Sequence, residues 1–173
     1  MKPVKITLLF FSIFLIYFKS SAQRPHLNIY GHVLYASPLD KSSKDLYTGG
    51  AGVEAGVLIG RGKTMFNAMI GTTRFFADDG NQYGYLTYVP VKVGIRQYLP
   101  LTMHFLFVQG DAGVGFTNSR YLANDGTRFA ADIGAGVKFG LFDAAILWDN
   151  IHEENPKGWA SWFTVKAGLN LGF

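Results

Sequence analysis

The sequence predicts an all-β protein, an eight-stranded antiparallel up-and-down barrel that crosses a membrane. Three observations predict it: strand-length segments with alternating polarity, a leader-like N-terminus, and connections that alternate between long and short. Successive side chains of a strand point to opposite faces, so a membrane barrel alternates apolar outward residues with polar or small inward ones. The last segment, 163–173, shows this pattern most clearly, since every odd-numbered residue from Phe163 to Phe173 is apolar.

The N-terminus has the layout of a secretory signal. A thirteen-residue run, Ile6 to Phe18, follows Lys2 and Lys5 and precedes Ser20-Ser21-Ala22. This layout predicts a signal peptide over residues 1–22, cleaved after Ala22, and a barrel domain over 23–173. A retained anchor is the alternative, but the run is shorter than the roughly 20 residues that a spanning helix needs.

Charge and cysteine content exclude several classes of protein. The chain carries 16 basic and 12 acidic residues, but removing the leader with Lys2, Lys5 and Lys19 leaves 13 basic residues. Such a balance gives no support for nucleic-acid binding, which needs a clustered basic face. The chain has no cysteine, which rules out a disulfide framework and a lipoprotein anchor.

Eight segments are expected to form the strands, and most reach the 9 to 11 residues that cross a bilayer at a tilt. They are residues 27–36, 49–60, 65–76, 85–98, 103–116, 128–139, 143–150 and 159–173. The connections 37–48, 77–84, 117–127 and 151–158 are long and polar, whereas 61–64, 99–102 and 140–142 are short. Outer-membrane barrels have long outer loops and short periplasmic turns, so both mature termini are expected in the periplasm.

Segments differ in how clearly they alternate. In the second, Ala51 to Ile59 form an apolar face opposite glycines and Glu54, and the fifth and sixth repeat this with Asp111 and Asp132 among their glycines. The first, third and seventh are weaker. The fourth contains Pro90, which cannot donate to a β-ladder and predicts a bulge or a local break.

Outward aromatic residues are expected in two belts at the membrane interfaces. Phe66, Phe139 and Phe173 form the periplasmic belt, and Tyr35, Phe116, Phe129 and Phe163 form the outer one. A soluble lipocalin-like barrel is the rival fold, but it would bury the apolar faces and expose Glu54, Asp132 and Lys166.

The leader, the eight segments, the glycine-rich stretch from Asp132 to Lys138 and the final aromatic residue together resemble the small outer-membrane β-barrel family, the OmpA-barrel and OmpX-like group. The stretch Tyr88-Val-Pro-Val-Lys-Val-Gly94 is similar to versions of this family from Bacteroidetes-type bacteria. The resemblance implies a Gram-negative outer membrane location. It also implies that Phe173 serves as the signal for handover to the barrel-assembly machinery.

Inward charged residues at similar height form the candidate site. They are Glu54, Lys92, Arg96, Asp111, Asp132 and Lys166. Asp111 and Asp132 are expected on neighbouring strands, where their carboxylates repel unless a lysine or Arg96 lies between them. We expect a neutralised clasp that fills the narrow interior, with a proton or ion path as the alternative.

Several groups at the outer rim allow other chemistry. Asp149, His152, Glu153 and Glu154 gather near the last outer loop, where a base or half a metal site is an alternative to surface charge. Residues 78–81, Asp-Asp-Gly-Asn, have the content of a calcium turn but lack the remaining ligands, so a surface turn is favoured. Arg74 and Arg120 are expected near lipopolysaccharide phosphates or as solvated charge. No metal or cofactor is predicted.

The sequence favours a monomeric outer-membrane barrel with a structural or surface-interaction role. Its expected partners are membrane lipid, the assembly machinery and an unknown contact of the outer loops. One alternative is an outer-leaflet lipid-modifying enzyme of the lipid A acyltransferase or deacylase kind. That enzyme needs a histidine beside a nucleophile, and the nearest rim serine, Ser161, has outward parity. The second alternative is a narrow channel or a secretion-assembly accessory barrel.

Overall fold

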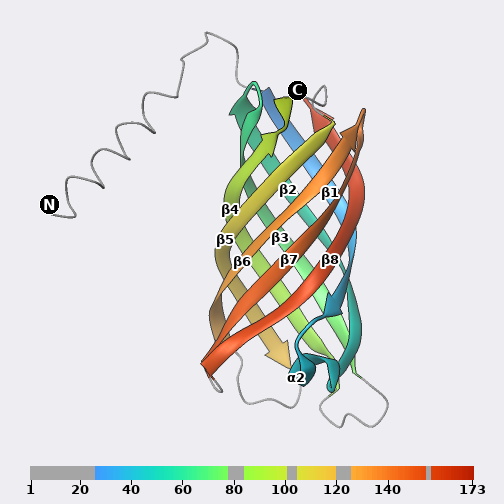
Figure 1. The fold of residues 1–173 in the computed structure, drawn as a ribbon, viewed down its shortest axis with the longest axis vertical. Helices are drawn as coiled ribbons and strands as arrows, with labels where there is room; N and C mark the ends of the chain where they lie inside the picture. Colours follow the sequence, from blue (N-terminus) through green and yellow to red (C-terminus); the bar gives the residue numbers. More distant parts are fainter. Residues whose placement is uncertain (1–25, 78–83, 101–104, 120–125, 155–156) are drawn as a thin grey trace, which may run out of the picture.

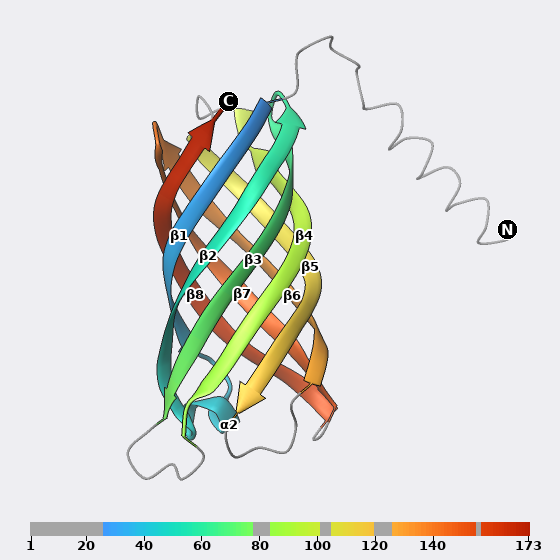
Figure 2. The same ribbon diagram turned by 180° about the vertical axis from the view of Figure 1, so that it is seen from behind.

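The computed structural model describes residues 26–77, 84–100, 105–119, 126–154 and 157–173. The described residues form a closed antiparallel barrel in which each strand pairs with its neighbour in sequence and β1 pairs with β8 (Figures 1 and 2). The strands are β1 His26–Pro38, β2 Tyr47–Arg61, β3 Thr64–Ala77, β4 Leu86–Tyr98, β5 Leu106–Ser119, β6 Gly126–Phe139, β7 Phe142–Glu154 and β8 Lys157–Gly172. The predicted fold class is therefore confirmed.

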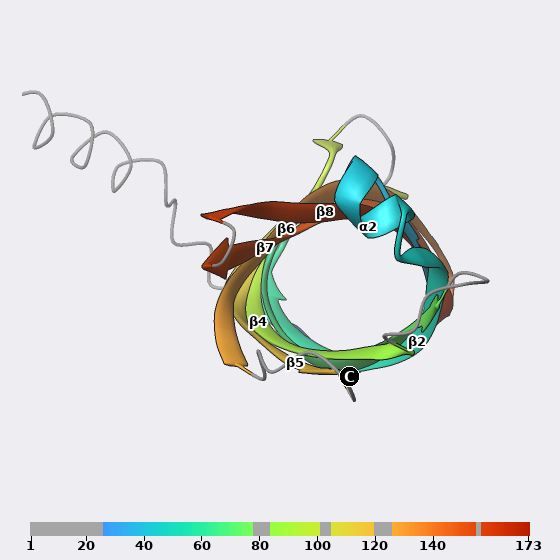
Figure 3. The ribbon, with the colours of Figure 1, turned by 90° about the horizontal axis from the view of Figure 1, so that it is seen from below.

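The only described helix is a single turn, α2 Lys41–Lys44, capped by the Asp40 side chain, which accepts from the Ser43 backbone N–H. It lies at the rim of the barrel (Figure 3). Among the described residues, no helix combines the length and the apolar character needed to cross a bilayer. The predicted signal peptide, residues 1–22, lies outside the described residues.

The connections define two ends of the barrel. We call the end with connections 39–46, 78–85, 120–125 and 155–156 the loop end, and the end with 62–63, 99–105 and 140–141 the turn end. Gly62 and Gly140 have positive φ, 64° and 60°, and each begins a two-residue hairpin turn, where glycine adopts this conformation without a steric penalty.

The predicted alternation of long and short connections is wrong at two places. Residues 151–158 do not form a long loop, because β7 and β8 stay paired up to Glu154 and Lys157. The connection between β4 and β5, residues 99–105, is longer than the 99–102 expected. Past the apolar part of a strand both faces are polar, so the two-residue pattern disappears although the strand continues.

Pro90 breaks the ladder on one side only. Pairing of β3 with β4 stops after Ile70–Val91 and resumes at Thr73–Tyr88 in the same register, so the predicted local break occurs without a bulge. On the other side, Pro90 pairs with Gly115 of β5 in an uninterrupted ladder. The missing N–H therefore affects only the contact with β3. A register shift does occur elsewhere, between Tyr47 and Gly49 of β2.

Polarity is inverted relative to a soluble protein. Outward Val33, Val93 and Ile133 are 66%, 63% and 62% exposed, while inward Lys92 and Lys166 are 2% and 1% exposed. All seven aromatic residues predicted for the two belts are exposed on the outer face. A soluble lipocalin-like barrel would show the opposite arrangement, because water favours polar side chains outside. The interior face predicted from the alternation is thus the one found.

Two apolar layers fill the ends of the lumen. Tyr47, Phe75, Tyr88 and Trp162 pack together toward the loop end, with ring centroids of Phe75 and Tyr88 lying 5.3 and 5.1 Å from that of Trp162. Toward the turn end, the second layer is formed by Tyr30, Leu58, Met65, Met69, Tyr98, Phe107, Ala145 and Leu147. The charged residues lie mainly between these layers.

Candidate functional site

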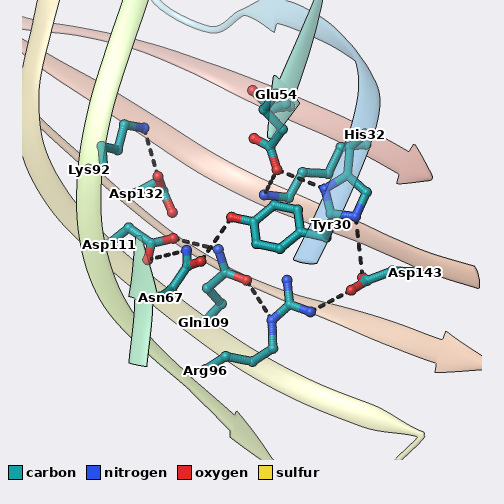
Figure 4. A network of polar contacts seen from close by, with 12 residues as sticks. Tyr30, His32, Glu54, Asn67, Lys92, Arg96, Gln109, Asp111, Asp132 and Asp143 are labelled. Atoms are coloured by element: carbon teal, nitrogen blue, oxygen red, sulfur yellow. Dashed lines mark hydrogen bonds and ion pairs between the residues drawn. The ribbon is translucent and has the colours of Figure 1, made fainter. Parts of the chain in front are cut away.

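The candidate site is the polar interior of the barrel. The structure places all six predicted residues inside with buried side chains: Glu54, Lys92, Arg96, Asp111, Asp132 and Lys166. Figure 4 shows the first five. Their strands alternate glycine or alanine with large side chains on the inward face, which leaves room for the long polar groups. Eight-stranded barrels have a lumen just wide enough for side chains to fill.

Lys92 neutralises two carboxylates at once. Its Nζ donates to Asp132 Oδ2 at 2.7 Å and to Asp149 Oδ1 at 2.6 Å. The other oxygen of Asp149 accepts from the Thr164 hydroxyl at 2.6 Å. This group joins β4, β6, β7 and β8 across the lumen, because one ammonium can donate several hydrogen bonds.

A second group is centred on Arg96. Its guanidinium donates from Nη1 to Asp143 Oδ2 and from Nε to Gln109 Oε1, and it lies 3.9 Å from the centroid of the Phe107 ring. Asn170 also donates to Asp143, at 2.8 Å. Arg96 therefore contacts both the buried polar side chains and Phe107, a member of the apolar layer toward the turn end.

His32 and Lys166 share Glu54. His32 Nδ1 lies 2.8 Å from Glu54 Oε1, and Lys166 Nζ donates to the same oxygen at 2.6 Å. His32 Nε2 lies 3.9 Å from Asp143 Oδ1, so the ring stands between two carboxylates (Figure 4). The ring also stacks on Tyr30, with centroids 4.8 Å apart.

Asp111 and Asp132 have separate partners rather than one lysine or arginine lying between them. The two residues are cross-strand partners, but among the described residues no cation bonds to both. Asp111 accepts from the amides of Asn67 and Gln109, whereas Asp132 accepts from Lys92. The two carboxylates are therefore opposite each other in the ladder but bind different partners. At Asp111, side-chain amides take the place expected for a cation.

Four interior residues central to these groups were missed by the sequence reasoning: His32, Asp143, Asp149 and Asn170. Asp143 and Asp149 share the inward parity of β7 with Ala145 and Leu147, so the alternation could have located them. Asp149 was instead assigned to the outer rim, which is wrong. Within the described chain, the buried interior holds five carboxylates, three lysine or arginine cations and His32.

The rim residues do not form a site together. Asp149 points inward, whereas His152 lies on the outward parity and its ring packs against Trp159 at a centroid distance of 5.2 Å. Ser161 donates its hydroxyl to Asn150 Oδ1 at 2.7 Å. Across the described residues, no cluster of three or more possible metal ligands is found. Residues 78–81 and Arg120 lie outside the described residues.

Arg74 lies on the outer face near the loop end. Its guanidinium carbon is 3.6 Å from the centroid of the Tyr85 ring. Both side chains are exposed, and within the described part of the chain no carboxylate pairs with this guanidinium. The stack holds the charged group at the surface in a defined orientation.

Comparison with solved structures identifies the architecture. Neither a protein-family model nor a curated protein matches the chain. Neisserial surface protein A matches with a TM-score of 0.59 at 11% identity, covering 85% of this chain and 97% of that one. The chain has the fold of a small outer-membrane β-barrel.

A second similar protein is the outer membrane protein Ail of Yersinia pestis. Its structure in a phospholipid bilayer nanodisc matches with a TM-score of 0.56 at 12% identity, covering 86% of this chain and 100% of that one. A structure of Ail with the heparin analogue sucrose octasulfate matches at 0.52 and 13% identity, covering 85% and 97%. At these identities the likeness concerns the fold alone.

Proposed function

We propose that the protein is a monomeric integral protein of the bacterial outer membrane whose barrel supports the outer loops and contributes to membrane integrity. The observation that carries this proposal is the inverted polarity, with Val33, Val93 and Ile133 outside and Lys92, Arg96 and Lys166 buried. An apolar outer surface is stable in hydrocarbon, and a closed barrel leaves no unpaired strand edge there. The role is structural or interaction-based, without catalysis.

The proposal also gives an orientation. The loop end faces outward and the turn end, with both mature termini, faces the periplasm, as expected for barrels of this kind. Phe173 then lies at the periplasmic end, where the barrel-assembly machinery would receive it. Envelope lipid and partners of the outer loops are the expected contacts.

Membrane placement is tested by fractionation. Cells expressing the full chain are broken and extracted first without and then with detergent, and the extract is run unheated and heated on a denaturing gel. We expect the protein in the detergent fraction, with a shift in mobility on heating as the barrel unfolds. Recovery in the soluble fraction without detergent contradicts the proposal.

The channel alternative predicts a different electrical behaviour. With apolar layers at both ends of the lumen, we expect no conductance step from the purified barrel in a planar bilayer. Lys92→Ala with Lys166→Ala alone should leave the trace flat, because both layers remain. Adding Trp162→Ala and Phe107→Ala, one from each layer, should produce steps. Steps from the unmodified chain favour a channel instead.

A further inference from the structure

The outer face carries a depression that crosses the junction of the first and last strands. It has a volume of about 880 Å³ and an almost wholly apolar lining, a size within the roughly 300–1,000 Å³ of small-ligand pockets. Its floor is Gly31 of β1 directly opposite Ala55 of β2. Ile70 pairs with Ala55 on one side and Leu169 with Gly31 on the other, so two larger residues form the walls.

The small floor residues leave real space. A side-chain carbon added at Gly31 would have its nearest neighbour, the Glu54 carbonyl oxygen, at 3.9 Å. This contrasts with inward Gly168 on the adjacent strand, where the same carbon would collide with the backbone of β1. Gly31 therefore is not required by packing within the barrel, and its lack of a side chain opens the outer face.

Polar groups lie above this depression toward the loop end. Tyr35, Ala51 and Arg74 are consecutive cross-strand partners on β1, β2 and β3. The phenol oxygen of Tyr35 lies over Gly49, and Arg74 stacks on Tyr85. The small residue Ala51 thus stands between Tyr35 and Arg74 in this row. Ala55 is four positions further along β2 than Ala51, roughly 13 Å at the rise of a strand.

We propose that this face binds one phosphate-bearing lipid of the outer leaflet, with a phosphate at Arg74 and Tyr35 and an acyl chain in the depression. A guanidinium forms charge-assisted hydrogen bonds to phosphate, and no described carboxylate competes for this one. The apolar depression begins one row of residues below, so a single amphipathic molecule reaches both. The inference rests on the proposed membrane placement and names a lipid that this placement brings into contact with the chain.

The test is native mass spectrometry of the folded, detergent-extracted full chain with three probes. These are a lipid A carrying two phosphates, the same lipid without phosphates, and inorganic phosphate. Arg74→Gln should weaken binding of the phosphorylated lipid about tenfold, the effect of one charged hydrogen bond, and leave the other lipid unchanged. Gly31→Leu should weaken both lipids, because it fills the depression. Inorganic phosphate should not bind.

Two matched controls separate a site from a general lipid coat. Gly110→Leu fills an outward glycine on β5 whose nearest neighbour is likewise at 3.8 Å, and Arg61→Gln removes a positive charge at the turn end. Both should bind like the unmodified chain. Equal binding by Arg74→Gln and Arg61→Gln, or by Gly31→Leu and Gly110→Leu, overturns the site.

Heat-modified mobility checks that each variant is folded, and Ala55→Leu fills the same depression if Gly31→Leu does not fold. The two proposals fail differently. A chain released without detergent overturns the membrane placement, whereas a membrane-inserted barrel with indiscriminate lipid binding overturns only the lipid site.

Discussion

Removing the ammonium of Lys92 should strongly destabilise the barrel. In Lys92→Met, Asp132 and Asp149 lose the cation that bonds to both at 2.7 and 2.6 Å, at a position where Lys92 is 2% exposed. Removing one partner of a buried ion pair costs about 3 to 5 kcal/mol, chiefly because a charge is left uncompensated. Two carboxylates depend on this lysine, so we expect the upper part of that range.

The free energy of unfolding is measured by urea titration of the barrel refolded into vesicles, followed by tryptophan fluorescence. The triple variant Lys92→Met, Asp132→Asn and Asp149→Asn should recover at least half of the loss, because neutral amides leave no buried charge. Lys44→Met, an exposed lysine on α2, should change stability by less than about 0.5 kcal/mol. A loss below about 1 kcal/mol for Lys92→Met, or no recovery in the triple variant, refutes the reasoning.

Three further variants test the backbone and assembly. Gly140→Val should lose about 1–2 kcal/mol in the same titration, because its φ of 60° disfavours a branched side chain, while Gly140→Asn should lose less; equal losses contradict this. Gly168→Ala should lose about 1–3 kcal/mol through overpacking against β1, and Gly31→Ala, its neighbour across the ladder, should be near neutral; the reverse order contradicts the packing. Phe173→Ala should lower the folded fraction in the membrane, measured by heat-modified mobility, with an unchanged fraction arguing against an assembly signal.

The alternation made the barrel predictable because hydrocarbon imposes one rule on every outward position. Val53, Ile133 and Val165 are apolar for the same physical reason in three different strands. A repeated constraint of this kind can be read from a single chain. The strand ends lack it, and there the prediction was wrong: residues 151–154 continue β7 beyond the apolar segment.

Partners inside the lumen could not be predicted in the same way. Alternation assigns Lys92 to the inward face, but which carboxylate it meets depends on the register and on which strands face each other across the barrel. Lys92 of β4 reaches Asp149 of β7, 57 residues away in sequence. Asp111 and Asp132 were correctly expected on neighbouring strands, yet amides from β3 and β5 rather than a cation satisfy Asp111.

The layered interior bears on where recognition can occur. Charges that bridge non-neighbouring strands hold the barrel together from within, since the ion pairs of Lys92, Arg96 and Lys166 join strands that share no ladder, as Lys92 does for β4 and β7. The apolar layers around Trp162 and Phe107 lie to either side of most of these charges, and burial strengthens the ion pairs because the protein interior screens charge less than water does. The lipid site proposed above lies on the opposite face of the same strands, on the lipid-facing surface, where Arg74 carries a charge that no described residue neutralises.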